Sequence, residues 1–501
     1  MKLARLSLLL LATVATALPA AAATLKIGLA DDADVLDPDQ ARTFVGRIVF
    51  TALCDKLVDV TPELKIVPQL ATKWSWSDDQ KTLTMQLRKG VKFQDGTTFD
   101  AAAVKANIER SKTLKESRRK SELTSIDSVE VAGDHTVKFH LKQPDATLLA
   151  QFADRSGMMM SPTAFKKEGE KFSSDPVCSG PFQFVNRVQQ DRIELKKFDG
   201  YWNADKIKVD AVTYLPIPDA TVRLSNLRSG DLDIVDRVAP TDVKQVEQAP
   251  DIHIEKAVSL GYQGITINID NTKRGDTPIG NEKLLRQALS LSIDRNALNQ
   301  VVFNGVYKAG NQPFPPTSPW YDKSASMSGR DIDKAKALMK KAGQEKVSLT
   351  MNAPNSPQEL QVAQVLQSMI KPAGFDLKIQ PMEFASLLSA DTAGNFELSQ
   401  IGWSGRIDPD GNIDQFVRCG AGLNDSHYCN KKVDTLLQDA RETQDNAERK
   451  QKYDAANEIL MKDLPIIYLY HQTWLFGVRK DINGFKAYPD GMIRLEGVTK
   501  G

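Results

Sequence analysis

The sequence predicts an α/β fold divided into about three units, or into two lobes of which one is subdivided. The chain has 501 residues, more than the roughly 250–300 at which a single hydrophobic core stops growing. Residues 347–403 read as strand, helix, strand, short helix and strand, an order typical of parallel strands covered by helices. In such lobes ligands bind at the carboxyl ends of the strands. Residues 402–410 occupy such an end and are the first candidate site.

Most predicted strands alternate apolar and polar residues, the pattern of half-buried strands. They are residues 25–30, 83–87, 136–141, 193–198, 211–217, 264–269, 347–353 and 465–471. Helices are delimited by their caps: Asp331 is suited to begin one, and Gly343 to end it in a left-handed conformation. Asp445, followed by Glu448, resembles a capping box at the start of another. A third, over 358–370, places its apolar residues on one face.

The N-terminus predicts export. Lys2 and Arg5 precede an apolar stretch, residues 6–18, which leads through Pro19 into a run of alanines. A basic start, an apolar core and a small-residue end are typical of a secretory signal peptide. A membrane-spanning helix needs ~20 apolar residues and is the less favoured alternative. We therefore expect residues 1–23 to be a signal peptide cleaved near Ala22 or Ala23, and the remainder to be periplasmic.

Charge argues against two classes of partner. The chain has 65 Lys and Arg against 64 Asp and Glu, whereas a nucleic-acid binder would present a basic face. No later window resembles a membrane span. We expect no nucleic-acid partner and no membrane insertion.

The four cysteines all follow the predicted signal peptide, an even number in an oxidising compartment. Cys419 and Cys429 enclose a polar, Gly-rich segment that can close as a loop. We predict that they pair, which leaves Cys54 with Cys178, although spacing does not prove connectivity. The alternative is a metal site, but the chain has no C-x-x-C and its five histidines are scattered. We expect no metal and no cofactor.

Four stretches together resemble the periplasmic binding proteins of peptide and nickel ABC importers. They are residues 83–110, residues 175–184 with the aromatic segment ending at Trp202, residues 283–298 with the strand upstream, and residues 402–412. Their order and spacing match that family over almost the whole chain. The resemblance implies a two-lobed periplasmic binding protein fold (type II, cluster C-like) with an accessory subdomain.

The resemblance also implies the boundaries of these units. Lobe I would comprise residues 24–64, 187–262 and 475–501, with residues 65–186 as its accessory subdomain, and lobe II would be residues 263–474. Crossings near 261–266 and 470–476 would form the hinge. The implied function is a receptor, expected to be a monomer, that closes on a small peptide-like or anionic solute and then docks on a membrane permease.

Arg406 is the most informative candidate in the cleft. Peptide-binding members of the family have an acidic residue near this position, after a similar Gly-Trp stretch, that receives the amino terminus of the peptide. A guanidinium binds carboxylate or phosphate and repels ammonium, so we expect Arg406 to anchor an anionic group. Two alternatives are an internal salt bridge with Asp408 or Asp410, and a one-residue shift that leaves Asp408 to bind an amine.

The other candidates lie in loops that the resemblance places along the cleft. Their functional interpretation competes in each case with ordinary packing or solvation. The full set of predicted ligand-binding residues is Trp403, Ser404, Gly405, Arg406, Asp408, Tyr262, Phe44, Asp32, Asn352, Asn355 and Glu383. Residues 408–412 also faintly resemble a calcium loop, but its twelfth position would be Cys419 instead of an acid, which favours a plain turn.

Three other functions compete with peptide capture. A metal chelate or another organic solute would involve histidines such as His427 or His471, and a periplasmic chaperone would use exposed apolar surface. Catalysis is disfavoured because Ser404 lacks a complete G-x-S-x-G elbow, and no H-E-x-x-H, P-loop or G-x-G-x-x-G motif is present.

Overall fold

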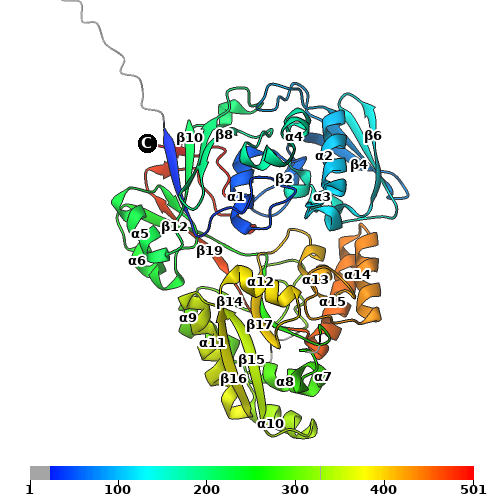
Figure 1. The fold of residues 1–501 in the computed structure, drawn as a ribbon, viewed down its shortest axis with the longest axis vertical. Helices are drawn as coiled ribbons and strands as arrows, with labels where there is room; N and C mark the ends of the chain where they lie inside the picture. Colours follow the sequence, from blue (N-terminus) through cyan, green and yellow to red (C-terminus); the bar gives the residue numbers. More distant parts are fainter. Residues whose placement is uncertain (1–22, 273, 326, 328) are drawn as a thin grey trace, which may run out of the picture.

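The computed structural model describes residues 23–272, 274–325, 327 and 329–501 (Figure 1). The predicted signal peptide lies outside the described residues, apart from Ala23. Of the five sheets formed by the described residues, the three larger ones separate into an upper part with two and a lower part with one (Figure 1). This is the two-lobed α/β arrangement that the sequence predicts.

Lobe I contains a seven-stranded sheet, with β1 (Thr24–Leu29) at its centre. This strand runs parallel to β10 (Ala211–Pro216) and β11 (Ile234–Val235). Its side chains Leu25, Ile27 and Leu29 are fully buried, as their alternation in the sequence predicts. The remaining strands of the sheet are β8 (Phe182–Val188), β9 (Arg192–Lys197), β12 (Ile252–Val258) and β19 (Thr473–Arg479). Its helices are α1 (Phe44–Leu53), α5 (Ala220–Ser229) and α6 (Val243–Glu247).

The accessory subdomain is built on a four-stranded antiparallel sheet. The strands, in spatial order, are β4 (Ala71–Trp76), β5 (Thr82–Leu87), β7 (Thr136–Leu141) and β6 (Ile126–Gly133). Helix α2 (Ala101–Thr113) covers this sheet and begins at Asp100, whose side chain accepts a hydrogen bond from the Ala103 amide. The helices α3 (Leu148–Gln151) and α4 (Pro162–Glu168) complete it, and the small pair β2 (Val58–Val60) and β3 (Ile66–Pro68) leads into it from lobe I.

Lobe II contains a six-stranded sheet. Its strand β15 (Val347–Pro354) lies parallel to both β16 (Phe375–Met382) and β17 (Leu398–Trp403), with α11 (Pro357–Ile370) and α12 (Phe384–Thr392) between them in the chain. The predicted alternation over 347–403 is thus confirmed. The other strands are β13 (Tyr262–Ile267), β14 (Lys308–Ala309) and β18 (Ile466–His471); the other helices are α7 (Pro278–Asn281), α8 (Lys283–Leu291), α9 (Arg295–Phe303), α10 (Ile332–Lys341), α13 (Asp410–Val417), α14 (Lys431–Glu442) and α15 (Asn446–Asp463).

The predicted helix caps are present. Asp331 accepts a hydrogen bond from the Lys334 amide, and Asp445 accepts from the Ala447 and Glu448 amides. Gly343 follows α10 with φ +74°, the left-handed conformation expected of it. A last short pair, β20 (Ile482–Asn483) and β21 (Thr499–Lys500), closes the C-terminal segment against lobe I.

The lobes are joined by two crossings that lie side by side. The chain passes from β12 to β13 through residues 259–261, and from β18 back to β19 through Gln472. The Ser259 amide donates to the Gln472 carbonyl at 2.8 Å. His471, fully buried, donates from Nδ1 to the Gly261 carbonyl at 2.7 Å. These two contacts tie the crossings together.

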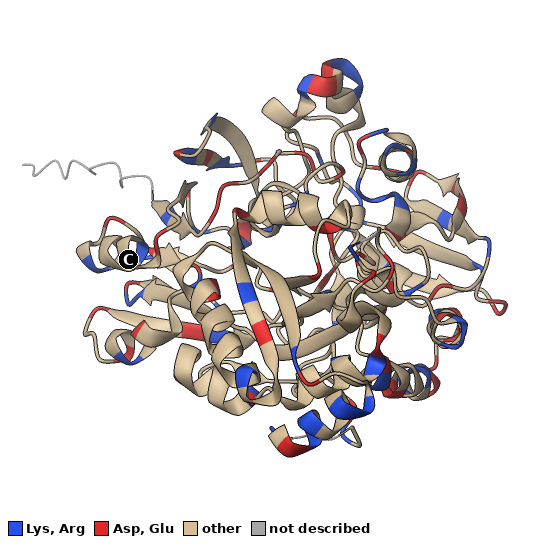
Figure 2. Cartoon of the chain, turned by 60° about the horizontal axis from the view of Figure 1, so that its bottom comes forward, with Lys and Arg blue, Asp and Glu red and all other residues tan. Residues whose placement is uncertain are grey.

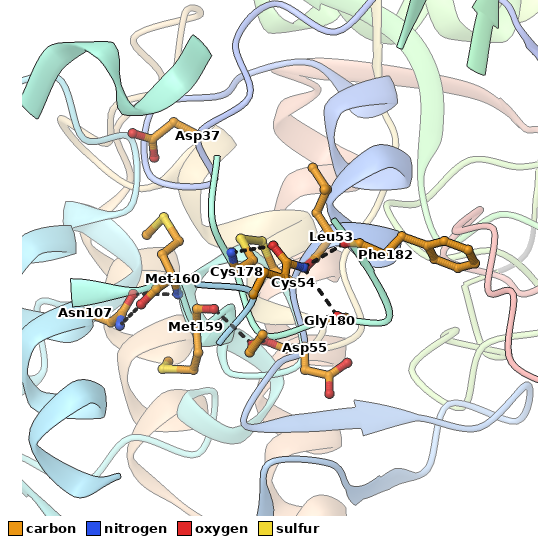
Figure 3. The surroundings of a disulfide bond; sticks show 12 residues. Asp37, Leu53, Cys54, Asp55, Asn107, Met159, Met160, Cys178, Gly180 and Phe182 are labelled. Carbon is orange, nitrogen blue, oxygen red and sulfur yellow. Dashed lines mark hydrogen bonds between the residues drawn. A yellow bond between two sulfur atoms is a disulfide. The ribbon is translucent and has the colours of Figure 1, made fainter. Parts of the chain in front are cut away.

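Both predicted disulfides are present. Cys54, after α1, bonds Cys178, and Cys419 bonds Cys429. Figure 3 shows the first bridge, where the end of α1 meets the segment that leads to β8. Gln94 of the accessory subdomain supports this junction, since its Nε2 donates to the carbonyls of Leu53 and Phe182. Lobe I and its accessory subdomain are therefore joined by both covalent and hydrogen bonds.

Charges of both signs alternate over the elements of both lobes (Figure 2). Among the described residues, no helix is long and apolar enough to cross a membrane.

Candidate functional site

The loop that follows β17 is closed by one amide side chain. Asn412 Oδ1 accepts hydrogen bonds from Trp403 Nε1 at 3.1 Å and from the Arg406 amide at 2.7 Å, and Asn412 Nδ2 donates to the Arg406 carbonyl at 2.8 Å. The guanidinium carbon of Arg406 lies 4.2 Å from the centroid of the Trp403 ring, a cation–π contact. The predicted site residues Trp403 and Arg406 therefore form one rigid group.

Gly405 sets this loop against the hinge. Its φ of +91° is one that side-chain-bearing residues rarely adopt, and a Cβ here would lie 2.4 Å from the Leu260 carbonyl carbon and 2.5 Å from the Gly261 nitrogen. Glycine is therefore required both by conformation and by space. The loop that carries Arg406 rests directly on the first crossing.

Arg406 reaches across to the accessory subdomain. Its Nε lies 3.4 Å from Oδ2 of Asp154, which also accepts two hydrogen bonds from Arg47, at 3.1 Å from Nε and 2.7 Å from Nη2. Burial opposes ionisation of Asp154, but the charges of Arg47, Arg406 and Arg155 hold its pKa well below the usual range. One carboxylate thus receives cations from lobe I and from lobe II.

The internal salt bridge considered for Arg406 is absent. Asp408 pairs instead with Arg449 at 2.7 Å, and Asp410 pairs with Arg441 at 2.6 Å. The alternative in which Asp408 binds an amine is weakened because its carboxylate is buried and already holds a cation. The predicted plain turn at 408–412 is also wrong in part, since α13 begins at Asp410.

Burial and the nearby positive charge of Arg47 lower the pKa of Arg406 to about 10. The guanidinium therefore stays charged at neutral pH. Arg406 also borders a cavity of about 140 Å³ between the lobes. Its lining comes from the lobe I turn at Glu63 and Leu64, from the hinge, and from lobe II; the lobe II and hinge residues are Leu260, Phe314, Pro315, Ser318, Pro319, Trp320, Arg406, Ile407 and Asn412.

The accessory subdomain meets lobe II at further points. The Ala146 amide donates to the Arg441 carbonyl at 2.8 Å. Ile407, next to Arg406, packs against the core of the accessory subdomain. In Figure 1, α13 and α14 of lobe II lie beneath this subdomain. The structure is therefore a closed arrangement of the lobes.

The two predicted site residues of lobe I, Phe44 and Asp32, contact residues other than Arg406. Phe44 stacks on Trp474, with ring centroids 4.6 Å apart, and lies under the Arg237 guanidinium. Asp32 pairs with Arg187 at 3.0 Å. Both side chains are used within lobe I.

The remaining lobe II predictions fall into two groups. Tyr262 is buried and pairs across the sheet with Trp403, with its ring edge-on to that of Tyr468 at 4.7 Å. Asn352 is buried too, and its amide donates to the Asn395 carbonyl at 3.3 Å. Asn355 and Glu383 are exposed, at the carboxyl ends of β15 and β16, and Ser404 is half-buried in the loop. The structure brings Tyr262 and Ser404, but not Asn355 or Glu383, next to the Arg406 group.

Sequence reasoning missed the lobe I side of the site. Asp154, Arg47, Arg119 and Arg155 converge there from segments far apart in the chain, and Asp154 is 107 residues from Arg47. An acid next to an arginine is common in any sequence, so the pair at 154–155 did not indicate a binding site. Among the described residues, no group of three or more His, Cys, Asp and Glu side chains is placed to hold a metal ion.

Two lobes joined by paired crossings, with a charged loop of one lobe facing the other, define a periplasmic binding protein. Residues 65–424 match the family described as Bacterial extracellular solute-binding proteins, family 5 Middle. The chain is 30% identical over 495 residues to the glutathione-binding protein GsiB of Escherichia coli O6:K15:H31 (strain 536 / UPEC), with 95% of each chain covered. It is 29% identical over 468 residues to the dipeptide-binding protein of Escherichia coli (strain K12), covering 87% of this chain and 86% of that one.

Solved structures agree. The periplasmic binding protein AgaA from A. tumefaciens R10, in complex with agropinic acid, superposes with a TM-score of 0.84 at 27% identity, covering 95% of this chain and 99% of that one. DppA from Helicobacter pylori, in complex with the peptide STSA, gives 0.85 at 25% identity, covering 95% and 98%. The chain belongs to bacterial extracellular solute-binding protein family 5. It is a substrate-binding receptor of an ABC importer and not an enzyme.

Proposed function

We propose that this receptor captures a small, anionic, peptide-like solute between lobe I and lobe II and delivers it to its membrane permease. One observation carries the proposal: Arg406 of lobe II stays charged and points at the lobe I side of the interface, where Arg47 and Asp154 lie. A receptor of this kind needs a ligand whose contacts with both lobes form only when the lobes are closed. A ligand group bound next to Arg406 would contact both lobes in the closed state.

Arg406 determines the sign of the ligand's charge. Peptide-binding members of the family use an acid at or near this position to receive an ammonium group. A guanidinium instead binds carboxylate or phosphate through paired hydrogen bonds. The nearby acids offer no replacement, because Asp408 is held by Arg449 and Asp410 by Arg441. The ligand group that meets this loop is therefore an anion.

The names of the relatives support a small solute of this kind. They bind a dipeptide, glutathione and agropinic acid. The proposed contacts in this chain are Trp403, Ser404, Gly405 and Arg406 of the loop with Tyr262 beside them. Phe44, Asp32, Asn352, Asn355, Glu383 and Asp408 remain predicted contacts.

The predicted division of the chain belongs to this proposal. Lobe I is residues 24–64, 187–262 and 475–501, the accessory subdomain is residues 65–186, and lobe II is residues 263–474. Residues 1–23 act as a signal peptide for export to the periplasm, and the receptor works there as a monomer that docks both lobes on the permease.

Titration calorimetry with a panel of solutes tests the proposal. The panel pairs Ala-Glu with Ala-Gln, glutathione with its glycine amide, and each peptide with its C-terminal amide. We expect 1:1 binding by members with a carboxylate, and a loss of at least tenfold in affinity on Arg406→Gln, which corresponds to about 1.4 kcal/mol. The control is Arg118→Gln, an exposed arginine. Tighter binding of a member without an anionic group, or unchanged affinity in Arg406→Gln, contradicts the proposal.

A further inference from the structure

Four arginines meet where lobe I, its accessory subdomain and lobe II come together. Arg47 extends from α1, Arg119 precedes the turn of 3₁₀ helix η1 (Lys120–Leu123), Arg155 begins η2 (Arg155–Gly157), and Arg406 follows β17. We call them the arginine cluster. The exposed fractions of Arg47, Arg119 and Arg155 are only 3%, 4% and 3%. Charges this deeply buried need anionic partners, because removing them from water is costly.

The carboxylates that contact the cluster are too few to balance its positive charges. Asp154 binds Arg47 and Arg406 and lies 4.0 Å from Arg155 Nε. Glu122 pairs with Arg119, and its second oxygen accepts a hydrogen bond from Ser156. Four guanidinium groups thus meet two carboxylates, which leaves an excess of two positive charges within the described residues.

Several hydrogen-bond donors of the cluster are unused. Arg47 Nη1, Arg119 Nε and Arg155 Nε are buried and have no hydrogen-bond partner in the described part of the chain. The repulsion between these positive charges has its largest effect on Arg155. Burial and the positive charges of Arg119, Arg406 and Arg47 together lower its pKa well below the usual range. Buried donors without acceptors are rare in folded proteins, so these nitrogens indicate a place for an acceptor that the chain does not supply.

The neighbouring acids are held by arginines outside the cluster. Asp37 and Asp39 both bind Arg110 from α2, so these two carboxylates share one guanidinium. Burial raises the pKa of Asp39 to about 6, so part of its charge is already lost near neutral pH. Asp490, which also feels the charge of Arg47, binds Arg494 at 2.8 Å.

We propose that Arg47, Arg119 and Arg155 of the arginine cluster form a second anion-binding subsite beside Arg406, so that the solute carries two anionic groups. This inference rests on the proposed function and deepens it. Arg406 holds one group from lobe II, and Arg47, Arg119 and Arg155 hold the other from the lobe I side. Two carboxylates match the excess of two positive charges. Each can accept bidentate hydrogen bonds from guanidinium groups.

A series of dicarboxylates tests the number of charges. Succinate, glutarate, adipate, pimelate and suberate are each compared with the half-amide of the same length, by titration calorimetry and by thermal denaturation against sodium chloride of equal ionic strength. We expect at least one dicarboxylate to bind at least about tenfold more tightly than its half-amide. We expect Arg119→Gln to remove most of that preference and Arg119→Lys, which lacks Nε, to remove part of it.

Arg118→Gln is the matched control, because Arg118 precedes Arg119 in the chain but its side chain is exposed. It should leave the preference unchanged. If half-amides bind as tightly as dicarboxylates but require Arg406, this inference is wrong and the proposed function stands. If Arg119→Gln is folded by its thermal transition and keeps the full preference, the assigned subsite is wrong. If no anion in either panel binds, both proposals are contradicted.

Discussion

Asp154 of the accessory subdomain and Arg406 of lobe II form an ion pair across the interface between the lobes, with 3.4 Å between Oδ2 and Nε. Because Asp154 also holds Arg47 of lobe I, this carboxylate stands between the two cations that we expect a solute to contact. Under the proposed function, the ion pair and the solute compete for the same arginine: Asp154 stabilises the closed lobes without solute, and the anion stabilises them with it.

Removing the Asp154 carboxylate tests how much it stabilises the solute-free protein. We expect Asp154→Asn to lower the free energy of unfolding of the solute-free protein by about 3–5 kcal/mol, because it leaves buried arginines without their acceptor. Arg406→Gln should cost less, since Asp154 keeps its two hydrogen bonds from Arg47. Urea denaturation measures both. Asp78→Asn, an exposed acid of the same subdomain, is the control, and an equal loss in that variant would contradict the assignment.

Gly405 should tolerate no side chain. Gly405→Ala forces a positive φ on alanine, which costs about 1–2 kcal/mol, and brings its Cβ within 2.5 Å of the hinge backbone. We expect lower stability and weaker solute binding, because the loop that carries Arg406 must move. Gly422→Ala is the matched control, since nothing lies within 4 Å of a Cβ there. Denaturation and calorimetry report the two effects, and equal behaviour of the two variants would rule out this role of Gly405.

His471 should make the hinge sensitive to acid. Burial lowers its pKa to about 4 from an ordinary 6.5. The unfolded chain therefore takes up the proton first, so the stabilisation is fully present above pH 6.5 and is lost as the pH falls toward 4. The 2.5-unit difference corresponds to about 3 kcal/mol. Between pH 7 and pH 4.5, we expect the free energy of unfolding, measured by urea denaturation, to fall less in His471→Gln than in the natural chain.

The control for that experiment is His253→Gln, a partly exposed histidine on β12. It should keep the pH dependence of the natural chain. The same slope in His471→Gln would show that another group is responsible.

The two disulfides should differ in their contribution to stability. Cys54–Cys178 closes a loop with a sequence separation of 124, and Cys419–Cys429 one of 10. Loop-closure entropy assigns about 5 kcal/mol to the first and about 3 kcal/mol to the second. We expect the double variant Cys54→Ser/Cys178→Ser to be the less stable in urea without reductant. A larger loss from Cys419→Ser/Cys429→Ser would contradict the estimate.

Features that depend on neighbouring residues could be predicted from the sequence. The strand and helix order over 347–403, and the caps at Asp331 and Asp445, follow from local periodicity and side-chain chemistry. The Cys419–Cys429 pair is local too. Arg406 could be selected because it follows a strand end and replaces an expected acid.

The partners of Arg406 could not be predicted in the same way. Asp154, Arg47, Arg119 and Arg155 meet it only after three separate units fold and close on one another, and no periodicity records which buried charges will lie together. The alternative considered for Arg406, a salt bridge with Asp408 or Asp410, is absent because Arg449 of α15 pairs with Asp408 and Arg441 of α14 pairs with Asp410.

Native mass spectrometry of the receptor purified from its host tests the central claim most directly, because the solute is then chosen by the protein. We predict a 1:1 complex with a small molecule that bears two acidic groups, and the loss of that molecule in the Arg406→Gln variant. A co-purified solute that is neutral or basic, or one that Arg406→Gln retains in full, would contradict the account.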